Sequence, residues 1–444
     1  MKRQAATARG FKRRVRDLEF WHVSDPRQSG KVSFTLPTML AALLFFLVTR
    51  ARSLRGVEQR TAQVAGKGRG QLGVDRRIAD NTFGKVLGRL PLRPLLACLH
   101  RLVKAEQRRG NLKPTRLPLG TVAIDGKAVG TLRWHDLCRV LGLEQASATA
   151  AQARALLGER YPEAQFCEPE QGEPYALLRV HTATLISSTA APCVHLRPIA
   201  GQTNEIGAMP ALLDELVEAY GRTRLFGRVT TDAGNTSAGV MAKVVASGWH
   251  YLAQIKVEHG AIYDEARRQL AGRRRQLASG TYADKQNGKT VTYYSWRYDL
   301  TEEGWLNWPH ARQLFRVRRE VWDPRTNRSR VGDRYYVSSQ TCDGLTASGA
   351  LRLSRAHWRC EEETHWTADA ELQEDRKRHA WSRSPSGLLA VCALRMMALC
   401  FLALARQLSR QGYSLERPSW AQVAEHFLLQ LCGGTLDTQA FDLV

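Results

Sequence analysis

Acidic residues are scarce in this chain of 444 residues relative to basic ones. It has 42 Asp and Glu against 65 Lys and Arg, which gives a formal net charge of +23. Such an excess predicts a polyanionic partner, because neutralising phosphates releases counterions and drives binding. Ribosomal, nucleoid and membrane-surface proteins share this imbalance, so charge favours nucleic acid as the partner and leaves the chemistry open.

Paired cysteines are also missing. Nine cysteines are scattered along the chain and no two of them form a CxxC pair, which excludes the common zinc modules and a disulfide scaffold. Scattered, unpaired cysteines indicate that the thiols are reduced, so we expect a cytoplasmic protein. The chain also lacks HExxH, the helical signature of a zinc protease.

Long apolar segments are few, and none is typical of a membrane span. The basic start, MKRQAATARGFKRRVR, has no apolar core of a secretory signal. The run Leu36–Val48 is too short to cross a bilayer, and the run 388–405 carries Arg395 at its centre, which is costly in lipid. We expect no membrane span and interpret the second run as a buried core helix.

What is present divides the chain into parts. Residues 1–117 have helical patterns, and we expect the basic residues 1–16 to form a flexible arm. Strand and helix patterns alternate over 118–256, with an Ala-, Gln- and Glu-rich segment at 133–172 that we interpret as a helical insertion. The expected strands are 121–125, 176–187, 193–200, 225–232 and 249–256, and the expected helices of this part are 210–219 and 236–247. Three strands, a helix and an acid-bearing strand predict an α/β fold with an RNase H-like core.

The alternation stops after residue 256. Residues 257–345 have the pattern of antiparallel strands and predict a β-rich basic insertion, and residues 346–444 are helical and complete the core. The insertion places Arg316, Arg318 and Arg319 among several tyrosines and tryptophans, which suits phosphate contact and base stacking. A half-buried sheet with a solvated basic face explains the same pattern, and both interpretations can hold together.

Three carboxylates stand at positions that suit metal chemistry. Asp125 ends the strand-like run TVAID, Asp232 ends VTTD, and Glu361 lies in the helix-like segment RAHWRCEEETHWTADAELQED. Two aspartates at strand ends and a helical glutamate can converge on hard divalent cations, which prefer oxygen ligands. An aspartate before glycine is also a common turn former, and Asp232 suits the cap of the following helix.

The order of the motifs resembles the DDE transposases of bacterial insertion sequences, in the subgroup of H-repeat-associated proteins. The resemblance spans roughly residues 36–400 and rests on several segments found in family order. They are LPTMLAALLFFLVTRARSLRGV, AIDGK, QTNEI, TTDA, RYYVSS and the HWxxE…HWxxD segment that starts at residue 357.

This resemblance implies a site and a reaction. Asp125, Asp232 and Glu361 would be the catalytic residues and would hold two Mg²⁺ or Mn²⁺ ions, and the spacing of the HW pairs selects Glu361 over Glu362 and Glu363. The protein would cut double-stranded DNA at the ends of its own element and join the 3′-hydroxyl to target DNA. We expect a homodimer in the synaptic complex, located in the bacterial cytoplasm at the nucleoid, with residues 1–117 binding the DNA ends.

Two alternatives stay open. One is a catalytically dead transposase remnant that still binds DNA, and the other is a DNA nuclease that cleaves without joining. The sequence departs from its relatives at KVEH, residues 256–259, where they have KGNQ, which fits a divergent subgroup or a decaying element. The presence of all three acids favours an active protein.

Further side chains are predicted to contact DNA. Two lysines beside the acid-bearing strands, Lys127 and Lys256, suit phosphate binding. The helix-like segment adds two His-Trp pairs, which suit orientation of the glutamate, backbone contact and base stacking, although core positions explain the tryptophans as well. These pairs are His357 with Trp358 and His365 with Trp366. Glu374 and Asp375 match a further acidic pair of the family, to which we assign no role.

Overall fold

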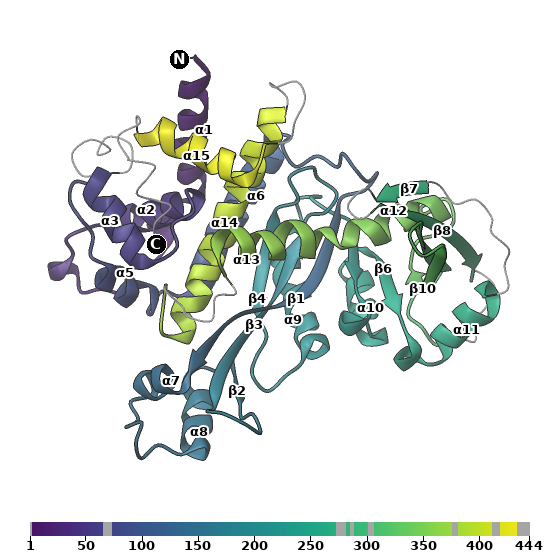
Figure 1. Ribbon diagram of the computed structural model, residues 1–444, viewed down its shortest axis with the longest axis horizontal. Helices are drawn as coiled ribbons and strands as arrows, with labels where there is room; N and C mark the ends of the chain where they lie inside the picture. Colours follow the sequence, from purple (N-terminus) through teal and green to yellow (C-terminus); the bar gives the residue numbers. More distant parts are fainter. Residues whose placement is uncertain are drawn as a thin grey trace.

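The computed structural model describes residues 2–64, 73–271, 281–284, 288–300, 306–374, 381–410 and 418–432. Within these ranges the strands form one mixed sheet of ten strands, in the order β2-β3-β1-β5-β6-β10-β9-β8-β7, with β4 also paired to β3. Figure 1 shows the N-terminal helices on the left of this sheet and the last strands of the sheet on the right.

Five strands and two helices form the predicted core. In chain order they are β1 (Thr121–Arg133), β3 (Tyr175–Thr184), β4 (Cys193–Pro198), α9 (Glu205–Tyr220), β5 (Arg228–Thr231), α10 (Ala238–Ala246) and β6 (His250–Ile255). β1, β3 and β4 are antiparallel neighbours, whereas β5 is parallel to β1 and β6 is parallel to β5. Three antiparallel strands followed by two parallel ones confirm the predicted RNase H-like α/β core.

The first strand is longer than its pattern predicts. The predicted strand ends at Asp125, but β1 continues to Arg133, because β3 pairs with it along this length and places Tyr175 opposite Arg133. The 133–172 segment lies at the end of this hairpin, at the bottom of Figure 1. It is helical as predicted and adds a short strand. Its elements are α7 (Trp134–Leu141), α8 (Ala150–Arg160) and β2 (Ala164–Cys167).

The β-rich insertion continues the core sheet and does not form a sheet of its own. β10 pairs antiparallel with β6, where Tyr335 lies opposite Ile255, and β9, β8 and β7 follow outward. Antiparallel strands are present as predicted, and a helix precedes them. These elements are α11 (Ala261–Leu270), β7 (Thr281–Asp284), β8 (Lys289–Asp299), β9 (Gln313–Asp323) and β10 (Arg328–Ser338).

The N-terminal region is helical, and its first segment differs from the prediction. The expected flexible arm is instead part of helix α1, because Phe11 and Leu18 are buried on one face and Arg14 forms a buried ion pair of 3.1 Å with Glu106. The described helical elements here are α1 (Lys2–Leu18), η1 (Phe20–His22), η2 (Ser29–Lys31), α2 (Leu36–Val48), α3 (Leu54–Val64), α5 (Asp80–Leu87) and α6 (Leu92–Arg108).

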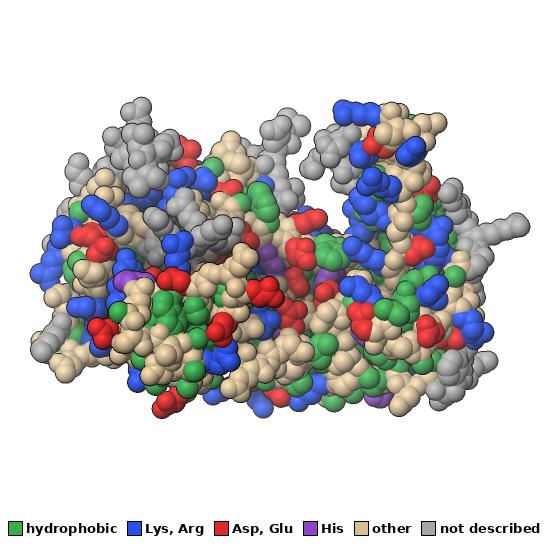
Figure 2. Space-filling view, turned by 60° about the horizontal axis from the view of Figure 1, so that its bottom comes forward, with side chains coloured by type: hydrophobic (Ala, Val, Ile, Leu, Met, Phe, Trp, Pro, Cys, Tyr) green, Lys and Arg blue, Asp and Glu red, His purple; other side chains and the backbone are tan. Residues whose placement is uncertain are grey.

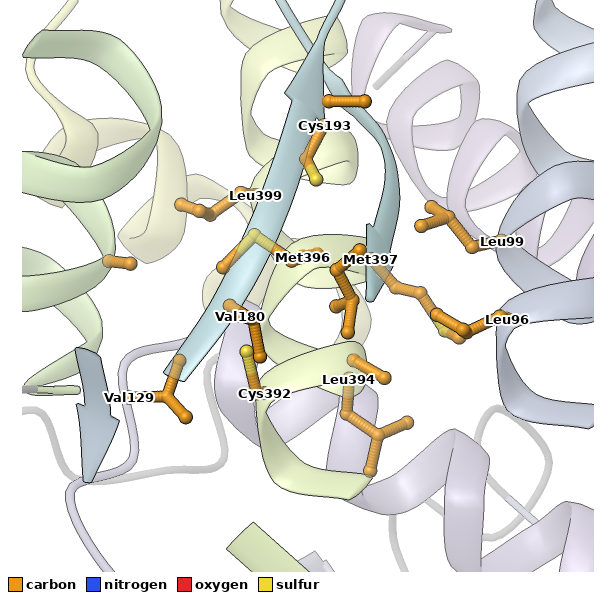
Figure 3. Packing of buried hydrophobic residues seen from close by; sticks show 14 of the residues in the cluster. Leu96, Leu99, Val129, Val180, Cys193, Cys392, Leu394, Met396, Met397 and Leu399 are labelled. Carbon is orange, nitrogen blue, oxygen red and sulfur yellow. The ribbon is translucent and has the colours of Figure 1, made fainter. Parts of the chain in front are cut away.

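The C-terminal helices join the N-terminal region to the core. Helix α14 (Pro385–Arg410) packs on α2 and α6, and α15 (Trp420–Cys432) packs on α1. Figure 3 shows side chains of α14, such as Met396 and Met397, between the sheet residue Val180 and Leu99 of α6. Helix α14 is the one described helix long and apolar enough to cross a membrane, and 94% of that apolar window is buried inside the protein. The predicted core helix is confirmed.

Candidate active site

Asp125 lies inside β1, at the point where pairing with β5 ends. Its neighbour Ile124 is opposite Thr231 of β5, while Asp125 itself is opposite Thr182 of β3. The side chain is 13% exposed, and the backbone N–H of Gly126 donates to its Oδ1 at 2.9 Å. His365 Nδ1 lies 3.6 Å from its other oxygen, Oδ2. Asp125 is therefore the first residue of β1 beyond the last pair with β5, and it keeps its pairing with β3.

Asp232 follows β5 directly and caps the short helical turn η3 (Ala233–Asn235). Its Oδ1 accepts from the backbone N–H of Asn235 at 3.0 Å and from the side-chain amide of the same residue at 2.9 Å. Asn235 is held in turn by His181 Nε2 at 2.9 Å. The capping role that the sequence suggests is present, but it uses only Oδ1, and the described residues give Oδ2 no hydrogen bond.

Glu361 lies on a π-helical turn, η5 (Cys360–His365), between α12 (Ala347–His357) and α13 (Trp366–Leu372). Such turns often occur at functional sites. The segment is fastened to the core on both sides, since His357 Nδ1 lies 2.9 Å from Thr230 Oγ1 and His365 Nε2 lies 2.7 Å from Thr182 Oγ1. These contacts hold Glu361 over the ends of β3 and β5.

The neighbouring glutamates differ in their surroundings. Glu363 is bound by Arg359 at 2.8 Å, and Arg359 also donates to the carbonyls that follow β3. The Glu361 side chain is largely exposed. Partial burial of its carboxyl, followed by the charges of Asp232 and Glu362, raises its pKa, whereas Arg334 opposes this rise. Of the two, Glu361 is the one whose charge interacts with those of Asp125 and Asp232.

The charges of the three carboxylates act on one another. Burial, followed by the charges of Asp232 and Glu361, raises the pKa of Asp125 to about 7. Among the described residues, no group of three or more Asp, Glu, His or Cys side chains is placed so that it could hold a metal ion as it stands. The acids are thus close enough to repel one another without a closed ligand shell. Their oxygen atoms are the donors that Mg²⁺ and Mn²⁺ prefer, so the chemistry of the donor set suits a divalent ion, while the side-chain positions do not yet form a ligand shell.

A fourth carboxylate, missed by the sequence reasoning, also reaches this site. Glu205 is the first residue of α9, within the QTNEI segment. Gly126 passes so close to it that a Cβ there would lie 2.3 Å from Glu205 Oε1. The charge of Glu205 contributes to the raised pKa of Asp125. The QTNEI motif could have suggested a role, but nothing local indicates that α9 begins beside Asp125.

Residues 171–401, slightly more than half of the 444 residues, match the family described as Transposase DDE domain. The chain belongs to this family. A search of curated proteins returns no match. As a DDE transposase the protein is an enzyme that acts on DNA, and such enzymes typically use divalent metal ions. The matched segment contains Asp232 and Glu361. It begins after Asp125, from which the insertion with α7 and α8 separates it.

Four of the side chains predicted to contact DNA are buried in the transposase. His357 and His365 are buried and connect the segment around η5 to the core strands. Burial lowers the pKa of each to about 4, so both are neutral at pH 7. Lys127 contacts Asp369, Glu374 and the carbonyl oxygen of His365. Arg316 is buried and pairs with Asp333 at 2.7 Å. Because DNA contact requires exposure, these four residues have internal structural roles instead.

The remaining predicted contacts are at least partly accessible. Lys256 and Arg319 are exposed, and Trp366 is 59% exposed. Trp358 is half-buried beneath the guanidinium of Arg334, which lies 4.5 Å from its ring centre. Arg318 is half-buried and forms an ion pair of 2.9 Å with Asp333, so its charge is already balanced.

The strand register sorts the arginines of the insertion onto two faces. Gly332 lies opposite Arg319 and Arg330 lies opposite Val321, so Arg319, Arg330 and their alternate neighbours Arg328 and Arg334 share one exposed face. Figure 2 shows Lys and Arg side chains along the projection at the upper right, the side where Figure 1 places β8 and β10, and acidic side chains and histidines near the middle. The sequence reasoning missed Arg328, Arg330 and Arg334.

Of the acidic pair Glu374 and Asp375, the structure gives a role to Glu374. Glu374 is fully buried between Lys127 Nζ, 3.1 Å from its Oε2, and Arg395 Nη1, 3.6 Å from its Oε1. Neither oxygen has a well-aligned hydrogen bond in the described residues. This ion-pair group ties β1, next to Asp125, to the core helix α14. Asp375 lies outside the described residues.

Proposed function

We propose that this transposase cleaves DNA at the ends of an insertion sequence and transfers the 3′-hydroxyl into target DNA, using two Mg²⁺ or Mn²⁺ ions held by Asp125, Asp232 and Glu361. One observation carries the proposal. Three carboxylates from β1, from the end of β5 and from η5 share one site, in which the pKa of Asp125 is raised to about 7. A divalent cation relieves this repulsion and stabilises the ionised acids.

Each residue has a defined part in this proposal. When bound, the ions would activate the attacking oxygen and stabilise the leaving oxygen. Asp125, whose pKa is raised by the charges of both other acids, would hold these ions together with Asp232 and Glu361. Asn235 and His181 hold Asp232 so that Oδ2 stays available. His365, which is neutral at pH 7, adds no competing positive charge beside Asp125.

The DNA contacts belong to two regions. We assign backbone contact to Lys256 and to the arginine face of β9 and β10, which is the exposed row Arg319, Arg328, Arg330 and Arg334. Trp358 and Trp366 flank η5 and suit stacking on a base near Glu361. Sequence-specific recognition of the element ends is assigned to the N-terminal helical region, since short helices on a basic module can enter a groove. The active form would be a homodimer in the bacterial cytoplasm, at the nucleoid.

The test is a cleavage and joining assay with the whole protein. It would be incubated with labelled terminal repeats of the element that encodes it, a supercoiled target and Mg²⁺. Wild type should give joined product, Asp125→Asn should bind the ends without cutting them, and the control Asp136→Asn, on α7 in the insertion, should behave as wild type. Cleavage without joining would identify a nuclease. Binding alone by wild type would identify a catalytically dead remnant.

A further inference from the structure

We propose that Glu205 is a fourth carboxylate of the metal site and binds a divalent ion together with Asp125 and Asp232. This inference rests on the proposed function, because it assumes that the three acids bind metal. It adds a ligand from α9, an element that contributes none of the three acids already assigned.

The backbone around Asp125 is shaped to let Glu205 approach. A Cβ at position 126 would lie 2.3 Å from Glu205 Oε1 and 2.6 Å from its carboxyl carbon, which is closer than any real side chain permits. Only glycine therefore fits next to Asp125 while the Glu205 carboxylate stays in place. Gly126 also donates its N–H to Asp125 Oδ1, so one residue contacts both acids.

A second glycine lies between Glu205 and Asp232. The Cβ direction of Gly234 points to a position 3.3 Å from Asp232 Oδ2 and 3.8 Å from Glu205 Oε2. The two carboxylates therefore flank the same small residue. Oδ1 of Asp232 lies 3.7 Å from the same position, so the nearer oxygen is Oδ2, the one that the cap of η3 leaves without a hydrogen bond. Glu205 thus lies beside Gly126, which binds Asp125, and beside Gly234, which follows Asp232.

The Glu205 carboxylate is only partly balanced by charge. Burial and the charge of Asp232 raise its pKa, and the charge of Arg179 opposes this rise without cancelling it. Glu205 is half-buried, and within the described part of the chain its carboxylate has no ion pair and no side-chain hydrogen bond. Arg179 forms no ion pair with Glu205; one of its amino groups donates to the carbonyl of Thr203 at 3.2 Å, and its Nε has no hydrogen bond. A half-buried carboxylate beside two others is unfavourable on its own, and a divalent cation offsets this cost.

A purely structural role for Glu205 predicts something different. An acidic residue in the first turn of a helix interacts favourably with the helix dipole. Asn204 already caps α9 by accepting from the N–H of Gly207 at 2.9 Å. If Glu205 served only the helix, its replacement would lower the stability of the metal-free protein and leave metal affinity unchanged.

The experiment is a titration of the whole metal-free protein with Mn²⁺ alone, without DNA, followed by calorimetry and by the electron paramagnetic resonance signal of free Mn²⁺. Wild type should bind Mn²⁺, and Glu205→Gln should weaken binding by roughly tenfold or more, because one ligand charge is lost. Glu205→Asp should restore part of the affinity. The control Glu218→Gln removes one exposed charge from the same helix, where Glu218 pairs with Arg93, and should bind as wild type.

The outcomes separate this inference from the proposed function. If wild type binds Mn²⁺ and Asp125→Asn does not, but Glu205→Gln binds normally, the fourth ligand is refuted and the three-acid site stands. If wild type binds no Mn²⁺, both proposals fail. Thermal unfolding of each variant without metal shows whether a loss of affinity reflects a loss of folding. Because the Glu205 charge is unfavourable without metal, Glu205→Gln should unfold at a temperature no lower than that of Glu218→Gln.

Discussion

The buried ion-pair group around Glu374 allows a quantitative prediction. The variant Glu374→Gln keeps the volume of the side chain and removes its charge, which leaves Arg395 without a carboxylate within ion-pair distance in the described structure. Arg395 is only 2% exposed and cannot regain water without opening the core. Lys127 is less affected, because it keeps Asp369 as a partner.

The expected cost follows from these contacts. Although burial opposes ionisation, the charges of Lys127 and Arg395 hold the pKa of Glu374 below its usual value, so the group is charged at pH 7. Removing one partner of a buried ion pair typically costs about 3–5 kcal/mol. We expect Glu374→Gln to lose a free energy of unfolding in this range, measured by urea denaturation. Glu168→Gln, which breaks the exposed pair with Arg154, should cost less than about 1 kcal/mol.

A second variant tests the cause. Adding Arg395→Met to Glu374→Gln removes the uncompensated charge and should recover most of the lost stability, because a buried pair can often be replaced by apolar groups at little cost. A Glu374→Gln protein within about 1 kcal/mol of wild type would refute the reasoning. So would a double variant less stable than the single one.

Three further predictions concern charge and DNA. Because burial and neighbouring acids raise the pKa of Asp125 from 3.8 to about 7, its ionisation destabilises the metal-free fold as pH rises through this window, and Asp125→Asn should be more stable than wild type at pH 8 by up to about 4 kcal/mol. Equal urea midpoints at pH 8 would contradict this. Replacing Arg328 and Arg330 by alanine should weaken binding to element ends and random duplex alike and lower the slope of log affinity against log salt by about 2 in a filter-binding assay. Replacing Lys12 and Arg16, both on the exposed face of α1, should instead reduce the preference for element ends in a competition assay, and a uniform loss would reject end recognition by this region.

Local patterns were sufficient for much of the architecture. The order of strands and helices between residues 118 and 256 indicates the RNase H-like core, because the alternation of periods is a property of neighbouring residues. The run 388–405 with a single Arg395 indicates a buried helix for the same reason. The candidate acids Asp125, Asp232 and Glu361 were also recognised from ordered motifs.

Other predictions failed because long-range pairing decides them. Residues 1–16 look like a solvated basic arm, yet Phe11 and Arg14 meet α14 and Glu106 from distant parts of the chain. Lys127 looks like a phosphate contact beside a catalytic strand, but Glu374, 247 residues away, removes it from the surface.

Sequence by itself determined which chemical groups the protein has and the periods that make its helices and strands. Tertiary structure decided which of these groups meet. The register of β9 and β10 places some arginines against Asp333 and leaves others exposed, and a shift by one residue would exchange the two faces. The start of α9 brings Glu205 to Gly126 across the sheet. Such encounters depend on distances through space, which local sequence patterns do not encode.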